Sequence, residues 1–429
     1  MPNFRLPINS DGFDIARSIT PFLRIANFKV LRERAQYLNS RAAKNEYVGH
    51  FILQRHRLEL AIWDVVYRYR KYDQLPPFFV QDQIDYSRLR AYNFMTMLCG
   101  VHQHLSASGK KRLEGRVAHG LSDENDLSSL AQEMDVMGNL MQFGCDVTCH
   151  DFEGGSGFDF LASRDGAEIE IECKVISTDK GRQIHQYDVL ALAERLPQFI
   201  DWNAFDNENA GAVVTVRLPA RMSRNPVVLT RMAKAIGESV KAKAAHSEPD
   251  FDIQYIPFDV KTSPFRAFHI FTEDEVGSFA RQFAKFGNSY DLVQVTPGKS
   301  ALIVSIGSNK PIKTVAYTYD SLKEGAKQLS GTRPGVLMAT FADLSSGDLE
   351  DLEADVPNNG FEGMSLRLFE NDQRKHLYSV HYISQPDYIV TREGNLAVKN
   401  RIYRFFNENS PFYEDPRYGW FVNGMPSLT

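Results

Sequence analysis

The stretch GFDFLASRDGAEIEIECKV, residues 157–175, decides the fold of this chain. Two runs of alternating apolar and polar residues flank Asp165 and Gly166, and Asp-Gly favours the tight turn of a β-hairpin. Side chains alternate between the two faces of a strand. One face of the second strand therefore carries four charged side chains, namely Glu168, Glu170, Glu172 and Lys174. Asp159 lies on the first strand, so we expect carboxylates and an ammonium group to converge on one surface.

This combination of side chains suits phosphodiester hydrolysis. Carboxylate oxygens, as in Asp159 and Glu172, are the ligands that Mg²⁺ or Mn²⁺ prefers. A lysine beside them, here Lys174, can position or deprotonate a water molecule and offset negative charge in the transition state. A divalent metal next to a phosphodiester polarises the bond and generates hydroxide. We therefore expect a metal-dependent hydrolytic site at this hairpin.

The residues before the hairpin predict a helix, a strand and a bend. Apolar residues recur at steps of 4, 3 and 4 from Leu130 to Met141, which predicts a helix over 127–142 with Ser129 and Gln132 as its capping box. A short strand over 145–149 and a glycine-rich bend at 154–157 follow.

In this order of elements, residues 128–192 resemble the PD-(D/E)XK, or restriction-endonuclease-like, nuclease superfamily. The pattern of that family is an Asp near a strand end, a gap of 10–20 residues, and then Asp or Glu, any residue, and Lys on the next strand. Here 12 residues separate Asp159 from Glu172, and Lys174 completes the triplet, whereas Phe158 stands in the place of the family's proline. The resemblance implies an α+β fold whose restriction-endonuclease-like core is a mixed β-sheet flanked by helices.

The resemblance also implies roles for individual residues. Asp159 and Glu172 would bind Mg²⁺ or Mn²⁺, and Lys174 would activate the attacking water. The preceding helix of the family often supplies a further acidic ligand, which Glu133 matches. The following helix often carries a Gln, Lys or Tyr that faces the site, and Gln186 is our candidate there, beside Gln183 and Tyr187. Most members of the family act on DNA, so DNA is favoured over RNA, and a homodimer is common where both strands are cut. Stand-alone nucleases of this kind serve restriction, defence or repair.

Other interpretations stay open at this point. The four charged residues of the second strand could form an ordinary solvent-facing surface over a buried aliphatic face. Three like charges in a row would repel one another, which favours a bound cation or a basic partner instead. A second alternative is a nuclease-like scaffold that no longer cuts and that binds nucleic acid or a protein partner. A third is an interaction module in a multi-component system.

The charge of the chain is unevenly distributed. Residues 1–120 hold 19 Lys and Arg against 10 Asp and Glu, a net of +9, whereas the remainder has a net of −14. Such an imbalance points to a polyanionic partner. We expect Lys110, Lys111 and Arg112, in a turn near Gly109, to contact nucleic acid. Trp63 and the tyrosines between 67 and 72 are interpreted as helix packing.

We expect three domains: a helical, basic domain over 1–120, a nuclease-like α/β domain with an insertion over 121–345, and a β-rich extension over 346–429. The polar stretch 343–360 is predicted to be a loop. With 43% hydrophobic and 12% aromatic residues, the composition excludes a disordered chain. No stretch reaches the roughly 20 apolar residues of a membrane span. The N-terminus lacks the features of a secretory signal, and the four cysteines form no disulfide pattern, so we expect a cytoplasmic protein.

Overall fold

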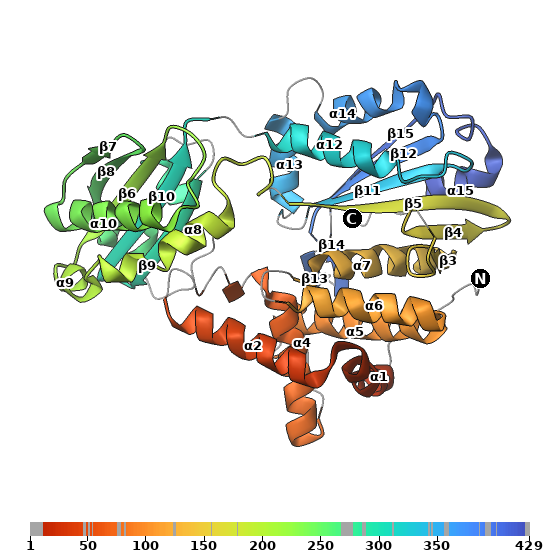
Figure 1. Ribbon diagram of the computed structural model, residues 1–429, viewed down its shortest axis with the longest axis horizontal. Coiled ribbons are helices and arrows are strands. Elements are labelled where there is room, and N and C mark those ends of the chain that lie inside the picture. The colour runs from red at the N-terminus through yellow and green to blue at the C-terminus, as the bar shows by residue number, and fades with distance from the viewer. Residues whose placement is uncertain are drawn as a thin grey trace. The chain divides into compact units, whose positions relative to one another are not determined.

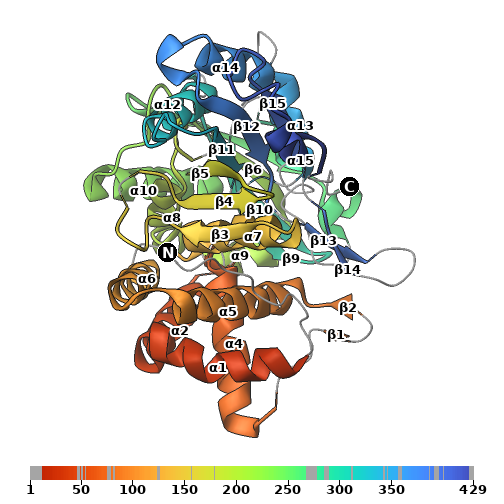
Figure 2. The same cartoon turned by 90° about the vertical axis from the view of Figure 1, so that its right-hand side faces the viewer.

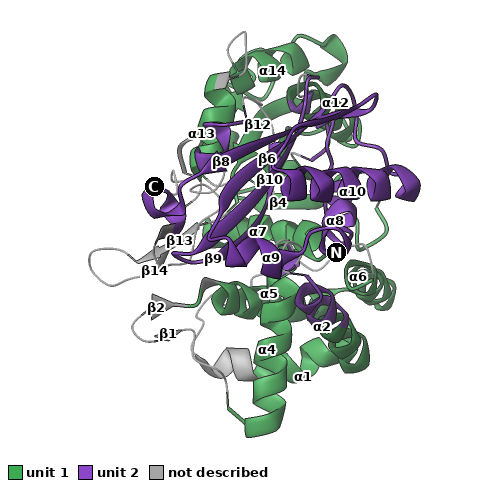
Figure 3. Cartoon of the chain, turned by 90° about the vertical axis from the view of Figure 1, so that its left-hand side faces the viewer, with its two compact units in different colours: residues 1–36, 56–178, 315–429 green, residues 37–55, 179–314 purple. Residues whose placement is uncertain are grey.

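The computed structural model describes residues 12–424, except 46–48, 50–51, 54, 75–78, 81–82, 123–125, 156, 178, 267–277, 285–288, 311–312, 342–343, 345, 356–359, 386, 391–395 and 400. The chain divides into two compact units (Figure 3). Unit 1 comprises residues 1–36, 56–178 and 315–429, and unit 2 comprises residues 37–55 and 179–314. These units do not share the boundaries at 120 and 345 expected from the sequence, and the assignment of functions to the three expected domains stays a prediction.

Unit 1 is built around a six-stranded mixed sheet with the order β15-β12-β11-β5-β4-β3 (Figure 2). Its strands are β3 (Asp146–Cys149), β4 (Phe160–Arg164), β5 (Ala167–Ile176), β11 (Gly335–Phe341), β12 (Leu377–Ile383) and β15 (Ile402–Phe406). β3, β4 and β5 form an antiparallel meander, whereas β11 runs parallel to both β5 and β12. The predicted α+β class is thereby confirmed.

The predicted hairpin between β4 and β5 is confirmed in its position and in its turn. Arg164 pairs with Ala167, which leaves Asp165 and Gly166 as the two turn residues. Both have positive φ angles, 53° and 80°, as a two-residue hairpin turn of type I′ requires. The turn thus sets the register that places Phe160 opposite Ile171.

Helices cover both faces of this sheet (Figure 1). One face carries α7 (Ser128–Gln142), beyond which lie α5 (Tyr86–His104) and α6 (Ala107–Gly120), and the other carries α12 (Thr314–Ala326), α13 (Ser346–Asp355) and α14 (Gly360–Phe369). β11 shows why the sheet is buried on both sides. Val336 and Met338 join the hydrophobic cluster of α7, whereas Leu337 and Ala339 join the cluster of α12 and α14. Two helical layers therefore enclose the sheet.

The first 120 residues are largely helical, as expected, with α1 (Gly12–Ala26), α2 (Phe28–Ala43) and α4 (Arg57–Tyr72) preceding α5 and α6. A two-stranded ribbon, β1 (Phe79–Val80) and β2 (Gln83–Ile84), interrupts them. Ile62 and Val65 of α4 are fully buried and belong to the same cluster as Met137 of α7. These helices thus extend the core on one side of the sheet.

Residues 346–429, expected to form a β-rich extension, contain helices α13 and α14 as well as strands, and β12 and β15 belong to the six-stranded sheet. Besides β12 and β15, this segment contains a ribbon of β13 (Asp387–Val390) and β14 (Leu396–Lys399), and it ends with the short helix α15 (Gly419–Gly424). None of the helices in the described part of the chain is long and apolar enough to cross a membrane.

Unit 2 contains a five-stranded sheet with the order β7-β8-β6-β10-β9. Its elements are α8 (Gln186–Ala193), α9 (Trp202–Asn207), β6 (Gly211–Leu218), α10 (Pro226–Ala242), β7 (His246–Glu248), β8 (Phe251–Phe258), β9 (Ser289–Thr296) and β10 (Ser300–Ser308). β6 and β10 are parallel, and the other pairs are antiparallel. The sequence predicts strands near 211–217, 252–256 and 301–306, which β6, β8 and β10 confirm, and a strand near 267–271, which lies outside the described residues.

Three local predictions are wrong. The acidic stretch after β11 forms α13 because Leu349 is fully buried in the cluster under α14. The basic segment near Gly109 opens α6, since the Ser106 side chain accepts a hydrogen bond from Gly109 N and caps the helix. Ser129 and Gln132 form no capping box, because the N-cap of α7 is Leu127, two residues before Ser129, and its N–H donates to the buried Glu59 of α4.

Candidate active site

Asp159 and Glu172 lie close together on neighbouring strands. Asp159 immediately precedes β4, and Glu172 lies within β5. Asp159 N donates to Ile171 O (3.1 Å), and Ile171 also pairs with Phe160, so the regular β4–β5 pairing ends here with Asp159 just beyond it. Asp159 is nevertheless close enough to Glu172 for the two carboxylates to repel each other. The Oδ2 atom of Asp159 accepts a hydrogen bond of 2.7 Å from Cys173 N. The backbone of β5 thus orients the first carboxylate.

Lys174 completes the group on the same face of β5. Its Nζ donates to Glu172 Oε1 at 2.5 Å and also to the side-chain oxygen of Gln328. The Glu172 side chain is 2% exposed and that of Lys174 is 23% exposed, so the carboxylate is enclosed while the ammonium group still reaches solvent. The structure therefore brings together the three residues that the sequence singled out.

Two glycines allow the segment after α12 to approach Lys174. A Cβ atom on Gly157, whose φ is 119°, would come within 2.5 Å of Gln328 O. A Cβ atom on Gly325 would lie 3.0 Å from Lys174 Cε. Sequence reasoning missed Gln328, because 154 residues separate it from Lys174 and all of residues 179–314 of unit 2 intervene.

Glu133 approaches the group from α7 but is held by an arginine. Arg116 of α6 donates two hydrogen bonds to its carboxylate, of 2.7 and 2.6 Å, and lies 3.6 Å from Asp151. The Glu133 side chain is buried. Arg116 was not predicted either, because no local sequence pattern distinguishes it from the other basic residues among the first 120. It places a positive charge from the N-terminal helices beside the carboxylates.

Burial dominates the electrostatics of these carboxylates. It raises the pKa of Glu172 to about 8, with repulsion from Asp159 adding to the effect and Lys174 opposing it. Burial likewise raises the pKa of Glu133 to about 7, against the attraction of Arg116. The pKa of Asp159 is raised by burial too, although the hydrogen bond from Cys173 counteracts it. A cation placed between these oxygens would stabilise their charged forms.

The solvent-facing interpretation of β5 is wrong for Glu170 and Glu172. Glu170 is fully buried and accepts hydrogen bonds from Ser330 N (2.8 Å) and Ser330 Oγ (2.5 Å). Arg333 contacts both Glu170 and Glu168, the latter at 2.8 Å. The segment between α12 and β11 therefore covers this face, and it neutralises the two glutamates that are not near Asp159.

The remaining predicted residues lie on α8 and α6, and their functional roles stay predictions. Gln186 opens α8 in unit 2, where its backbone N donates to Asp179 Oδ1 at 2.7 Å. Lys110, Lys111 and Arg112 occupy consecutive positions of α6, so their side chains leave the helix about 100° apart. Arg112 is engaged with Phe152 O at 2.7 Å. These three cations thus form no single basic face.

The carboxylates offer a partial set of metal ligands. Within the described part of the chain, no three or more His, Cys, Asp or Glu side chains lie close enough together to hold a metal ion as they stand. One buried oxygen, Glu172 Oε2, has no hydrogen-bond partner among the described residues. An unpaired buried polar atom costs about 1–3 kcal/mol, and more when it is charged. Two carboxylates plus water suit Mg²⁺, so Asp159 and Glu172 fit this ion.

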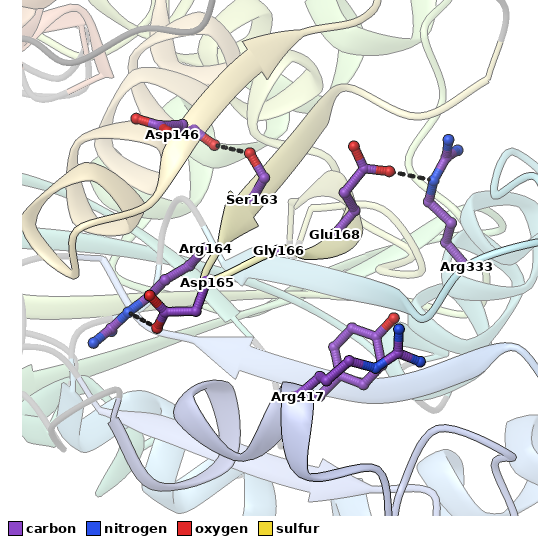
Figure 4. Close-up of a pocket in the computed structure, with 9 residues that line it drawn as sticks. Asp146, Ser163, Arg164, Asp165, Gly166, Glu168, Arg333 and Arg417 are labelled. Carbon is purple, nitrogen blue, oxygen red and sulfur yellow. Dashed lines mark hydrogen bonds and ion pairs between the residues drawn. The ribbon is translucent and has the colours of Figure 1, made fainter.

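A pocket of about 370 Å³ lies at the other end of the hairpin (Figure 4). It is lined by Asp146, Ser163, Arg164, Asp165, Gly166, Glu168, Arg333, Arg417 and Tyr418. Each of its arginines is paired with a carboxylate: Arg164 with Asp165 (3.4 Å), Arg333 with Glu168 (2.8 Å) and Arg417 with Asp415 (2.6 Å). Its charges are thus largely neutralised within the protein, unlike those around Glu172.

The chain matches no protein-family model, no curated protein and no solved structure.

Proposed function

We propose that this protein is a metal-dependent nuclease that hydrolyses phosphodiester bonds, with DNA as the favoured substrate. The observation that carries the proposal is the environment of Glu172. One of its buried oxygens binds Lys174 Nζ at 2.5 Å, and the other lacks a partner among the described residues. Asp159 stands beside it. A buried carboxylate pair next to a lysine is the set of groups that metal-assisted hydrolysis needs.

Asp159 and Glu172 would hold Mg²⁺ or Mn²⁺. When bound, the ion would polarise the phosphodiester and lower the pKa of a water molecule. Glu133, the third expected ligand, accepts two hydrogen bonds from Arg116. We propose that Glu133 holds this arginine in place near the site. Arg116 in turn offsets negative charge beside Asp159, which favours the approach of a phosphate group.

Lys174 would position the attacking water. Its Nζ is held between Glu172 Oε1 and the side-chain oxygen of Gln328, so two contacts fix its direction. A third N–H of the ammonium group is then available to a water molecule or a phosphate oxygen. Gln328 acts through Lys174 and is a positioning residue.

Two further observations support this proposal. A mixed sheet with helices on both faces is the arrangement expected of a restriction-endonuclease-like core. The main alternative, a scaffold that binds nucleic acid or a protein without cutting, has no need of a buried carboxylate with an unpaired oxygen. Such a group destabilises the fold, so a function is the reason to keep it.

A cleavage assay tests the proposal. The purified full chain would be incubated with supercoiled, linear and single-stranded DNA and with RNA, in Mg²⁺, in Mn²⁺ or in EDTA. We expect cutting of DNA with either metal and none in EDTA. Cutting that continues in EDTA would contradict the role of Asp159 and Glu172, and preferential cutting of RNA would contradict the choice of substrate.

A further inference from the structure

Helix α4 carries a stripe of aromatic and basic side chains on one side. Trp63, Tyr67, Arg70 and Lys71 follow one another at steps of 4, 3 and 1, so they share one face of the helix. Phe28, the first residue of α2, packs against Trp63 with a ring separation of 5.7 Å, and Trp63 packs against Tyr67 at 5.6 Å. Tyr72, the last residue of α4, leaves the helix on another side and is linked to Tyr67 through Lys71. We call Phe28, Trp63, Tyr67 and Tyr72 the aromatic stripe.

Two cations lie against these rings. The guanidinium group of Arg70 is 4.0 Å from the centre of the Phe28 ring. Lys71 Nζ lies 5.5 Å from the ring of Tyr67 and 5.0 Å from that of Tyr72. At these distances the cations are attracted to the ring faces and help to orient them.

Two rings of the stripe are exposed, whereas Phe28 and Trp63 are half-buried and pack against the core. Tyr67 is 42% exposed and Tyr72 is 55% exposed, whereas α4 buries Leu58, Ile62 and Val65 on its other side. Tyr67 packs against Trp63, as the interpretation of helix packing predicts, but both Tyr67 and Tyr72 leave much of their surface exposed.

The charge on this side of α4 is positive. Asp73, an exposed residue, follows Tyr72 as the C-cap of α4. Asp64, which lies within the helix, is bound by Arg68 at 2.7 Å and by Arg88 at 2.9 Å. It is thus neutralised by other cations, and Arg70 and Lys71 remain directed at the rings. The first 120 residues also carry a net charge of +9. The surface is complementary to a polyanion.

Exposed rings interleaved with cations match one kind of partner. Unpaired bases stack on aromatic side chains whatever their sequence, and the phosphates between them bind Lys and Arg. A duplex offers the phosphates but keeps its base faces stacked inside. We propose that the aromatic stripe, with Arg70 and Lys71, binds single-stranded DNA. The choice of DNA over RNA rests on the proposed function, whereas the preference for a single strand rests on the stripe alone.

A binding measurement in EDTA tests this inference. The full chain would be titrated into a fluorescein-labelled 20-nucleotide oligo(dT), with fluorescence anisotropy as the signal. Loss of one stacked base raises the dissociation constant roughly 5- to 150-fold, and we expect at least this loss for a variant with both Tyr67→Ala and Tyr72→Ala. The matched variant with Tyr67→Phe and Tyr72→Phe keeps the rings and should bind like wild type. Leu366→Ala, at a residue of α14 that is 48% exposed, controls for loss of an exposed apolar side chain elsewhere.

The salt dependence gives a second signal. Each phosphate contact to a single strand contributes about 0.7 to the slope of log affinity against log salt, so Lys71→Ala should reduce that slope by about 0.7. Unchanged affinity in the double alanine variant would overturn the inference, and so would tighter binding of a duplex of the same length. Tighter binding of oligo(U) would overturn the choice of DNA.

This test is separable from the test of the nuclease. EDTA removes metal-dependent cutting, so the anisotropy does not depend on whether Asp159 and Glu172 hold a metal. A protein that binds oligo(dT) through Tyr67 but cuts nothing would refute the nuclease and keep the stripe. A protein that cuts DNA, and whose alanine variant binds oligo(dT) as well as wild type, would refute the stripe alone.

Discussion

Arg116 of α6 donates two hydrogen bonds to the carboxylate of Glu133 of α7, from Nη1 to Oε2 at 2.7 Å and from Nη2 to Oε1 at 2.6 Å. This pair joins the N-terminal helices to the element that borders the candidate site. Arg116 also lies close enough to Asp159 for the two charges to attract. The geometry of the site is therefore expected to depend on residues well outside the segment that suggested it.

Arg116→Ala should destabilise the fold in a pH-dependent way. It leaves Glu133 buried without its partner, and breaking a buried ion pair on one side costs about 3 kcal/mol. The pKa of Glu133 is already raised to about 7, and it should rise further in the variant, so at pH 6 the carboxyl group can protonate and limit the loss. Urea denaturation at pH 6 and pH 8 should show the larger loss at pH 8. An equal loss of stability at both pH values would show that the charge of Glu133 is not involved. As a control, combining Arg116→Ala with Glu133→Gln should remove the pH dependence.

Glu172→Gln should gain stability relative to wild type as the pH rises. The pKa of Glu172 is raised to about 8 by burial, above the ordinary value of 4.5 that applies in the unfolded chain. The native state therefore binds the proton more tightly, and stability from this group is lost as the pH rises from 4.5 to 8. Gln keeps the shape and removes the titration. Thermal melts in EDTA should show the difference between variant and wild type shifting in favour of the variant across this range, and a difference that is constant with pH would contradict the raised pKa.

Gln328→Ala should lower kcat while leaving KM for DNA nearly unchanged. Gln328 touches Lys174 and acts only by fixing its direction, and a misplacement of about 1 Å in a catalytic group reduces the rate roughly 100-fold. Steady-state kinetics on a fluorogenic DNA substrate would separate the two constants. A large rise in KM with kcat unchanged would assign Gln328 to substrate binding instead.

Gly157→Ala should reproduce the kcat defect of Gln328→Ala, because its new Cβ atom would collide with Gln328 O and its φ of 119° disfavours any side chain. Gly115→Ala is the matched control, since a Cβ atom there meets no atom within 4 Å. Wild-type rates in Gly157→Ala would show that the approach of Gln328 is not needed.

Local sequence patterns were sufficient to predict the β4–β5 hairpin and the charged face of β5. Asp165 and Gly166 specify a two-residue turn, and the period of two in β5 then places Glu172 and Lys174 on one side. The extent of α7 was also predicted closely, whereas its capping was not, because Glu59 of another helix provides the partner of Leu127 N. Gln328 and Arg116 were missed for the same reason, since long-range packing brings them to the site. The burial of Glu170 was not predicted either, because the residues that contact it, Ser330 and Arg333, are distant in the sequence.

The central claim is that Asp159, Glu172 and Lys174 form a metal-dependent nuclease site, and the rate of DNA cleavage by Lys174→Ala tests it most directly. The control is Lys375→Ala, which removes a lysine that is 62% exposed and paired with Asp372. Loss of a positioned acid–base group reduces rates roughly 100- to 10,000-fold. We expect a loss of this size in Mg²⁺ for Lys174→Ala, with the melting temperature and oligo(dT) affinity close to wild type and with Lys375→Ala unaffected. Cleavage by Lys174→Ala at the wild-type rate would contradict the account.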